Sequence, residues 1–197
     1  MSGCRGRAPA WHSGAVPVAK LGNTSRRRVS AKLPDLLAPN LRVVFVGTAA
    51  GKRSAELGHY YAGRGNRFWL TLHEVGLTPR LYEPREFRDL LALGVGLTDI
   101  SKLGAGMDHQ IKRKQYDVPL FEANMRKYRP RTIAFTSKRA ASLFLRASST
   151  RGIAFGRRAK LPADFPEVFV LPSPSGAARG HWSVTPWREL ARWLKAA

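Results

Sequence analysis

The chain has 197 residues, a length that suits one globular domain, and 44% of them are hydrophobic, which is enough for a core. Lys and Arg number 34 against 13 Asp and Glu, and the resulting formal charge of +21 indicates a polyanionic partner, with nucleic acid as the first candidate. The single cysteine excludes an internal disulfide and a cysteine-rich zinc site, and no apolar stretch reaches the roughly 18 residues of a membrane-spanning helix.

Residues 1–33 are predicted to form a basic, disordered tail. They contain Lys and Arg but no Asp or Glu, together with several Gly, Ser and Pro residues, and Arg26-Arg27-Arg28 is the focus of their charge. Such a tail can contact phosphates without sequence preference, and a solvated leader without function is the alternative. The folded domain is expected to span residues 34–197.

The rest of the chain alternates predicted strands with predicted helices. The continuous apolar run at residues 41–47, LRVVFVG, is typical of a strand buried on both faces of a parallel sheet. Further strands are expected at residues 95–100, 131–137 and 167–173, and helices at 66–77, 84–94, 118–130, 138–148 and 185–197. This alternation predicts the α/β class, as a three-layer α/β/α sandwich around a central, mostly parallel sheet of four strands.

The segment after the first strand, residues 46–69, is crowded with aromatic and polar side chains: VGTAAGKRSAELGHYYAGRGNRFW. In a parallel sheet, ligands bind beyond the carboxyl ends of the strands, where this segment lies. It is not a phosphate loop, because three residues instead of four separate Gly47 from Gly51, and no Ser or Thr directly follows Lys52. Tyr60 and Tyr61 lie outside any periodic core pattern. We therefore expect at least one of them to stack on a flat ligand such as a nucleobase, with inward packing of one as the alternative.

Two later strand ends add polar groups at the same edge. Asp99 ends the second strand, where its carboxylate could orient a water or accept a hydrogen bond from a base, and capping of a turn is the alternative. Residues 172–182, PSPSGAARGHW, supply hydroxyls and backbone N–H groups with little bulk, which suits close approach to a DNA phosphate or insertion into a groove. No two histidines have the spacing of metal ligands, so we expect neither a metal nor another cofactor.

Taken together, these segments resemble the uracil-DNA glycosylase superfamily, most closely its mismatch-specific uracil/thymine branch. That branch carries Gly-Ile-Asn-Pro-Gly after its first strand, followed by Gly-His/Phe-x-Phe/Tyr-Ala and Asn-Arg-Phe-Trp, and later an Asn-Pro-Ser-Gly loop. The corresponding segments here are GTAAG, GHYYAG, NRFW and SPSG, and GVGLTDI resembles its second-strand motif. The resemblance covers residues 33–195.

The resemblance implies a base-excision repair enzyme. Such an enzyme flips uracil out of single- or double-stranded DNA and hydrolyses its N-glycosidic bond, which leaves an abasic site without a covalent intermediate. We accordingly expect a cytoplasmic monomer that needs no cofactor and has no membrane contact.

The resemblance also assigns roles by position. It places the base pocket, with Tyr61 as the aromatic that stacks on the base, at Gly47, Thr48, Ala49, Ser54, Tyr61 and Asn66. For Asn66, simple capping of a helix is the alternative. Ser173 matches the polar residue that faces the leaving base. The loop that enters the space vacated by the base corresponds to Pro174, Ser175, Gly176, Ala177, Ala178 and Arg179.

One departure concerns the water that attacks the sugar. The branch positions this water with the Asn of its first motif, but here Ala49 and Ala50 stand at the Asn and Pro positions, and a methyl group can neither accept a proton nor orient a water. Ser173 likewise replaces an Asn, or the His of other branches. Our hypothesis is that Asp99 holds the water while backbone N–H groups stabilise the uracil anion. Glu56 and His59 are the alternatives to Asp99.

Three other functions stay open at this point. The protein could bind lesions in DNA without cleaving them, or it could excise another deaminated base such as hypoxanthine. The third possibility is a basic α/β domain that binds RNA or DNA structurally. Its affinity for nucleic acid would not depend on the presence of uracil.

Overall fold

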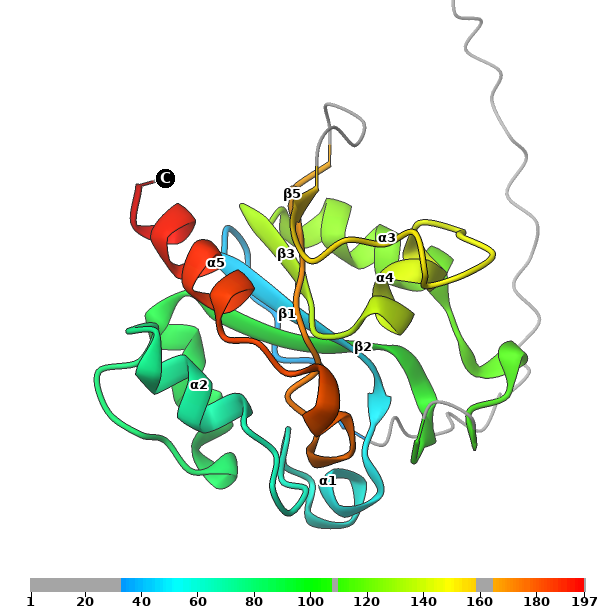
Figure 1. Cartoon of the computed structure of the whole chain (residues 1–197), viewed down its shortest axis with the longest axis horizontal. Helices are drawn as coiled ribbons and strands as arrows, with labels where there is room; N and C mark the ends of the chain where they lie inside the picture. The colour runs from blue at the N-terminus through cyan, green and yellow to red at the C-terminus, as the bar shows by residue number, and fades with distance from the viewer. Residues whose placement is uncertain (1–32, 108–109, 159–164, 197) are drawn as a thin grey trace, which may run out of the picture.

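The computed structural model describes residues 33–107, 110–158 and 165–196, which are drawn in colour in Figure 1. Residues 1–32, which make up nearly all of the predicted basic tail, lie outside the described residues, so the boundary of the predicted domain stays a prediction. None of the helices in the described ranges is long and apolar enough to cross a membrane.

A five-stranded sheet in the order β2-β1-β3-β5-β4 forms the centre of the molecule. Four strands run parallel: β1 (Val43–Ala50), β2 (Val95–Ala105), β3 (Thr132–Phe135) and β5 (Glu167–Val170). The fifth strand, β4 (Gly156–Arg158), pairs with β5 in the antiparallel direction. The predicted class, an α/β fold with a mostly parallel sheet, is confirmed, but the predicted number of four strands is wrong.

The missing strand in that prediction is β4. Its three residues, Gly-Arg-Arg, have neither an apolar run nor an alternating pattern, so sequence periodicity does not indicate a strand. It lies at the edge of the sheet, where charged side chains are tolerated. There Arg157 pairs with Glu167 of β5 at 3.0 Å and lies over the ring of Trp193 at 3.9 Å, so contacts with neighbouring elements hold this strand in place.

Helices cover both faces of the sheet and complete three layers (Figure 1). One face carries α2 (Phe68–Glu74), the 3₁₀ helix η1 (Pro84–Leu93) and α5 (Thr185–Ala196). The opposite face carries α3 (Val118–Tyr128) and α4 (Lys138–Phe144). This sandwich explains the continuous apolar run of β1, because Val43 and Phe45 pack into the first layer whereas Val44 and Val46 pack into the second.

The predicted helices form at the expected places, with local signals at their ends. Gly94, in the left-handed conformation at φ 71°, ends η1, which is a 3₁₀ helix and not the α-helix that the spacing suggested. Asp117 and Ser137 cap α3 and α4 by accepting backbone N–H groups at 3.0 Å. Among the described residues, three short helices were not predicted: α1 (Lys52–Leu57), η3 (Arg113–Gln115) and η4 (Gly176–His181).

The carboxyl ends of the parallel strands meet at one edge of the sheet. There β1 leads into α1, β3 leads into the Ser137 cap of α4, and β5 leads into the loop that begins at Leu171. The end of β2 stays paired with the end of β1, where Ala105 is the partner of Ala50 and the N–H of Gly106 donates to the carbonyl of Ala50 at 2.8 Å. The segments predicted to carry function are therefore gathered at a single edge.

Candidate active site

A cavity of about 630 Å³ opens at the carboxyl edge of the sheet. Its walls come from the end of β1, the start of α1, the end of β2, and the loops at residues 60–66 and 173–178. It brings together most residues predicted for the site: Gly47, Thr48, Ala49, Ser54, Tyr61, Asn66, Asp99, Ser173, Pro174, Ser175, Ala177 and Ala178. Gly176 lies in the same loop without lining the cavity, and the side chain of Arg179 lies outside the described part of the structure.

Asp99 lies on β2 directly beside Gly47 of β1 and is only 6% exposed. A Cβ atom on residue 47 would overlap Oδ1 of Asp99, so glycine is needed there to leave room for the carboxylate. Because alternate residues of a strand share a face, Ala49 points to the same side of the sheet as Gly47 and Asp99. Within the described ranges, no protein group donates a hydrogen bond to the Asp99 carboxylate, which lines the cavity.

Burial raises the pKa of Asp99 from 3.8 to about 7, because the ionised form is poorly solvated in this position. The positive charge of Lys102 opposes this rise in pKa, and the negative charge of Asp35 adds to it. At neutral pH the carboxyl group therefore exists in both protonation states. A carboxyl group with such a pKa can accept a proton near neutral pH and release it again.

The two tyrosines after α1 have different environments. Tyr60 is 2% exposed, packs against Phe87 with ring centroids 5.7 Å apart, and has a buried hydroxyl without a hydrogen-bond partner in the described structure. Tyr61, at φ 53°, lines the cavity and stacks on Phe68 with centroids 3.8 Å apart. Thr136 Oγ1 donates its own proton to the carbonyl of Val46. It therefore accepts the hydroxyl proton of Tyr61, at a distance of 3.2 Å. Both tyrosines line the cavity, but Tyr60 is packed inward against Phe87, whereas the ring of Tyr61 is anchored by Phe68 and Thr136.

Three other predicted pocket residues hold their own loops in place. The carboxamide oxygen of Asn66 accepts the N–H of Phe68 at 2.9 Å, a local bond just before α2, whose N-cap residue is Arg67 and not Asn66. Ser54 is buried and accepts the N–H of Ala62 at 3.0 Å. Thr48 Oγ1 lies 3.2 Å from Ser137 Oγ, which connects β1 to the start of α4. These contacts give the side chains a structural role, although each of the three predicted residues also lines the cavity.

The loop at residues 173–178 is fixed to the loop at residues 64–67. The N–H of Arg67 donates to the carbonyl of Pro174 at 2.8 Å. A Cβ atom on Gly176 would lie 3.1 Å from the carbonyl oxygen of Arg64, so a glycine allows the two backbones to pack closely. Within the loop, Ser173 Oγ accepts the N–H of Ser175 at 3.3 Å. The two loops therefore form one continuous wall of the cavity.

A sequence profile of the Uracil DNA glycosylase superfamily matches residues 34–196. The chain belongs to this superfamily. Its fold is also similar to a solution NMR structure of a protein from Methanosarcina acetivorans that was assigned as a candidate uracil DNA glycosylase. The TM-score is 0.58, with 23% sequence identity over 85% of this chain and 98% of that chain. The resemblance inferred from the motifs is thus confirmed for the superfamily, while the mismatch-specific branch stays a prediction.

The superfamily motifs did not indicate every residue of the cavity. Gly106, Met107 and Gln110 also line it, although the sequence predicted that the second strand ends at residue 100. In the structure, β2 continues to residue 105, and its glycine-containing end has no apolar pattern that would reveal the extension. Glu56 and His59, the alternatives to Asp99, are not among the described residues that line the cavity. Asp99 is therefore the better placed of the three candidates.

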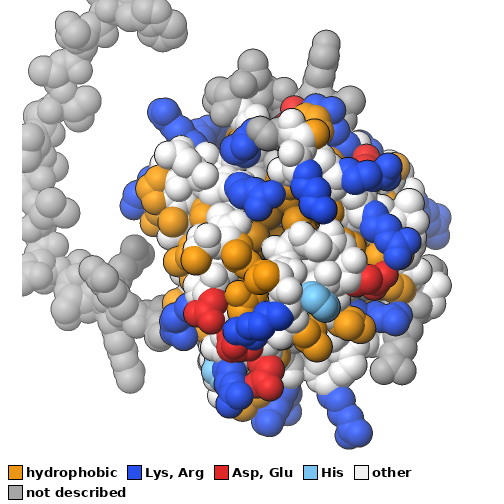
Figure 2. Space-filling view, turned by 90° about the vertical axis from the view of Figure 1, so that its left-hand side faces the viewer, with side chains coloured by type: hydrophobic (Ala, Val, Ile, Leu, Met, Phe, Trp, Pro, Cys, Tyr) orange, Lys and Arg blue, Asp and Glu red, His pale blue; other side chains and the backbone are white. Residues whose placement is uncertain are grey.

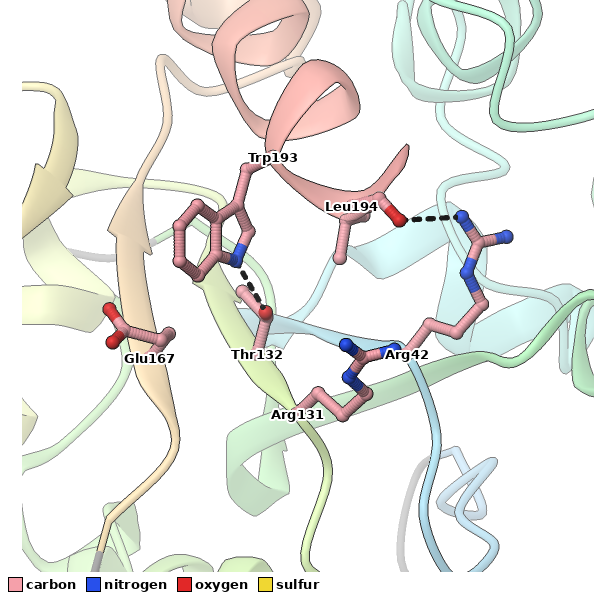
Figure 3. A pocket seen from close by; sticks show the side chains of 6 residues that line it. All are labelled: Arg42, Arg131, Thr132, Glu167, Trp193 and Leu194. Carbon is pink, nitrogen blue, oxygen red and sulfur yellow. Dashed lines mark hydrogen bonds between the residues drawn. The ribbon is translucent and has the colours of Figure 1, made fainter. Parts of the chain in front are cut away.

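A second, smaller cavity of about 170 Å³ lies at the opposite, amino edge of the sheet (Figure 3). It is lined by Arg42, Arg131, Thr132, Glu167, Trp193 and Leu194. Two hydrogen bonds join its walls: Arg42 donates to the carbonyl of Leu194 at 3.1 Å, and the indole N–H of Trp193 donates to Thr132 Oγ1 at 3.3 Å. These bonds attach α5 to the starts of the strands, which favours a structural role for this edge.

Proposed function

We propose that the protein is a monofunctional DNA repair glycosylase that removes uracil from DNA, acting as a monomer without a cofactor. The observation that carries the proposal is the buried Asp99 carboxylate, which lines the 630 Å³ cavity and has no protein donor among the described residues. A buried carboxylate without hydrogen-bond donors costs stability, and such groups concentrate at functional sites. Membership of the superfamily supports glycosylase chemistry at this cavity.

In the proposed step, a water held by Asp99 attacks C1′ of the deoxyribose while the bond from C1′ to the base breaks. The bonding electrons leave with uracil as an anion, and a proton of the water passes to the Asp99 carboxylate. The same carboxylate stabilises the positive charge that develops on the sugar. A pKa of about 7 suits this role, because a substantial fraction of Asp99 is ionised at neutral pH and its conjugate base is still strong enough to accept a proton.

The proposal explains how the attacking water can be held although Ala49 carries only a methyl group. Asp99 lies on the strand next to Ala49 and on the same face of the sheet, because its register partner Gly47 is two residues from Ala49. The attacking water would therefore be held from β2 instead of from β1. Gly47 is part of this arrangement, since a larger residue would displace the carboxylate.

Two side chains are proposed to bind the flipped base. Phe68 covers one face of the Tyr61 ring, and the base would stack on the other face. Ser173 Oγ accepts the N–H of Ser175, so its own hydroxyl proton is available to a carbonyl oxygen of the leaving base. That donation would strengthen as negative charge develops on the base, which favours bond cleavage.

The DNA backbone is proposed to contact the basic surface around the cavity. Lys52 lines the cavity, and Arg64 and Arg67 belong to the loop that packs against residues 174–176. Figure 2 shows one face of the molecule, on which Lys and Arg side chains are widely spread and acidic side chains are few. The loop at residues 174–179 would enter the space that the flipped base leaves. Binding should therefore weaken steeply as the salt concentration rises.

A cleavage assay over a panel of bases tests this proposal. Single- and double-stranded oligonucleotides that contain uracil, hypoxanthine or only normal bases are incubated with the protein and then treated with alkali, which breaks the strand at abasic sites. We expect strand breaks at uracil. Strand breaks only at hypoxanthine would mean that hypoxanthine, and not uracil, is the substrate. Tight binding to lesions without strand breaks would mean that the protein binds damaged DNA and does not cleave it. Equal binding to normal and damaged DNA, without breaks, would contradict any role in lesion recognition.

A further inference from the structure

The hydroxyl of Tyr61 lies near the Asp99 carboxylate, over the backbone of Gly47. A Cβ atom on residue 47 would overlap Asp99 Oδ1 and would lie 3.8 Å from Tyr61 Oη, so both oxygens adjoin the same point in space. Gly47 and Ala49, which share this face of β1, add no side chain larger than a methyl group. A single water joins oxygen atoms up to roughly 5.5 Å apart, because each O–H···O bond measures about 2.8 Å. Tyr61 Oη and Asp99 Oδ1 are therefore close enough for one water to bridge them.

The surrounding hydrogen bonds decide which way the Tyr61 hydroxyl faces. Thr136 Oγ1 donates its own proton to the carbonyl of Val46 at 3.2 Å and accepts the Tyr61 proton, also at 3.2 Å. Burial and the negative charge of Asp99 raise the pKa of Tyr61, so the phenol keeps this proton. The remaining lone pairs of Tyr61 Oη can only accept a hydrogen bond. The cavity thus has two acceptors beside each other, Tyr61 Oη and the Asp99 carboxylate.

Packing on both ends of the Tyr61 side chain fixes the position of its oxygen. The ring stacks on Phe68 with centroids 3.8 Å apart, and Phe68 is fully buried. At the other end, Thr136 is 4% exposed, and its N–H donates to the same Val46 carbonyl at 2.9 Å. The acceptor of the Tyr61 proton is therefore attached to the sheet itself. A water at Tyr61 Oη would be held by a rigid part of the molecule.

Two neighbouring acceptors orient a water in one way. Both of its protons point at the protein, and a lone pair points away, as attack on C1′ requires. We propose that Tyr61 is a second catalytic residue: its hydroxyl oxygen and the Asp99 carboxylate together hold the attacking water, while its ring binds the base. On attack, the water oxygen bonds to C1′, one proton passes to Asp99, and the other stays on the new 1′-hydroxyl. This inference rests on the proposed function of Asp99.

Tyr61→Phe tests the inference, because it keeps the ring and removes the hydroxyl. We expect the single-turnover rate on uracil DNA, at saturating protein, to fall about tenfold, the effect of one lost hydrogen bond, with unchanged affinity for that DNA. Thr136→Val should also lower the rate, since the Tyr61 proton is then free to turn toward the water, and Thr136→Ser should retain it. An unchanged rate in Tyr61→Phe would overturn the inference.

Thr132→Val is the matched control on the same strand. It removes the acceptor of the Trp193 indole N–H at the amino edge, so it loses a comparable hydrogen bond far from the cavity. We expect its cleavage rate to equal that of the unaltered protein. A loss as large as that of Thr136→Val would mean that weakening the sheet alone lowers the rate, which would contradict the inference.

A double-mutant cycle shows whether Tyr61 and Asp99 act on the same water. In an Asp99→Ala background the water has already lost one of its two acceptors, so Tyr61→Phe should cost less than about threefold there. An equal cost in both backgrounds would mean that the two side chains act independently, and it would contradict the inference.

A crystal structure of the protein without DNA gives a readout that does not depend on activity. We expect a water within hydrogen-bond distance of both Tyr61 Oη and an Asp99 oxygen, and we expect Tyr61→Phe to lack it. The absence of such a water from the unaltered protein would overturn the inference. If the unaltered protein cleaves no base, the proposed function fails as a whole. Cleavage at an unchanged rate by Tyr61→Phe overturns this inference alone.

Discussion

The two edges of the sheet carry cavities of different kinds. At the carboxyl edge, the cavity of about 630 Å³ contains Asp99, a buried carboxylate without a protein donor in the described residues. At the amino edge, the cavity of about 170 Å³ is lined by Arg42 and Arg131, and the carboxylate that lines it, Glu167, is paired with Arg157 at 3.0 Å. The amino edge is thus rich in charge, but several of its polar groups already have partners within the protein.

This difference shows why charge alone does not identify the functional site of a protein with a formal charge of +21. Polar groups that are paired inside the protein, such as Arg42 and Trp193, contribute to the fold. A buried polar group without a partner lowers stability and is retained where a ligand or a water supplies the missing contact. The comparison therefore predicts that substitutions at the carboxyl edge affect catalysis, whereas substitutions at the amino edge affect stability.

The largest expected effect is that of Asp99→Asn. Because an amide cannot accept the proton of the attacking water, the single-turnover rate on uracil DNA should fall at least about 10²-fold. Gly47→Ala, which leaves Asp99 in the chain but places a Cβ atom against its carboxylate, should lower the rate in the same direction. Ala49→Asp in the Asp99→Asn background restores a carboxylate on the same face and should recover part of the rate. A near-normal rate for Asp99→Asn would remove this residue from the mechanism.

The next effect concerns the binding of the base by Tyr61. Tyr61→Ala should weaken binding to lesion-containing DNA by roughly 1–3 kcal/mol, the range found when a stacking aromatic is removed. Tyr61→Phe is the matched control, because it keeps the ring over Phe68 and removes only the hydrogen bond to Thr136. Affinities are measured by competition against undamaged DNA of the same length. If Tyr61→Ala binds lesions as tightly as Tyr61→Phe does, the ring is a packing residue.

The burial of Asp99 also predicts how stability depends on pH. The pKa of Asp99 is raised from 3.8 to about 7 on folding, so between these values the folded protein binds more protons than the unfolded chain. Stability is then lost as the pH rises through 7, by about 1.4 kcal/mol between pH 6 and pH 8 from this group alone. Asp99→Asn should lack this loss. Urea unfolding at both pH values measures it, and a parallel pH dependence in the two proteins would contradict a raised pKa.

Local sequence signals were sufficient to predict much of the fold and of the site at the carboxyl edge. The apolar run of β1 and the alternation of strand and helix patterns after it depend on neighbouring residues, so the sequence predicted the layers and the functional edge. Asp99 could be proposed because it lies near the end of the predicted second strand; the prediction that it ends this strand is wrong, since β2 continues to Ala105. The role of Gly47 in leaving space for it depends on the pairing of β1 with β2, which no local pattern specifies.

Contacts between distant segments account for what the sequence did not reveal. Asp35 and Lys102 are 67 positions apart and meet because Leu36 pairs with Leu97, an isolated bridge without periodic pattern. Likewise, β4 is a strand because it pairs with β5, since its own three residues have no strand pattern. The local pattern also did not say which of the two tyrosines packs inward, and the contact of Tyr60 with Phe87 decides it.

The smallest expected effect tests the amino edge. Arg42→Gln removes the hydrogen bond to the Leu194 carbonyl, and we expect a loss of about 0.5–1.5 kcal/mol in the free energy of unfolding with no change in the cleavage rate. Arg85→Gln is the control for charge, since it removes one positive charge from an exposed ion pair with Glu83. If Arg42→Gln lowered the rate or the affinity for DNA more than Arg85→Gln does, the amino edge would also bind substrate. The distinction between a catalytic edge and a structural edge would then be wrong.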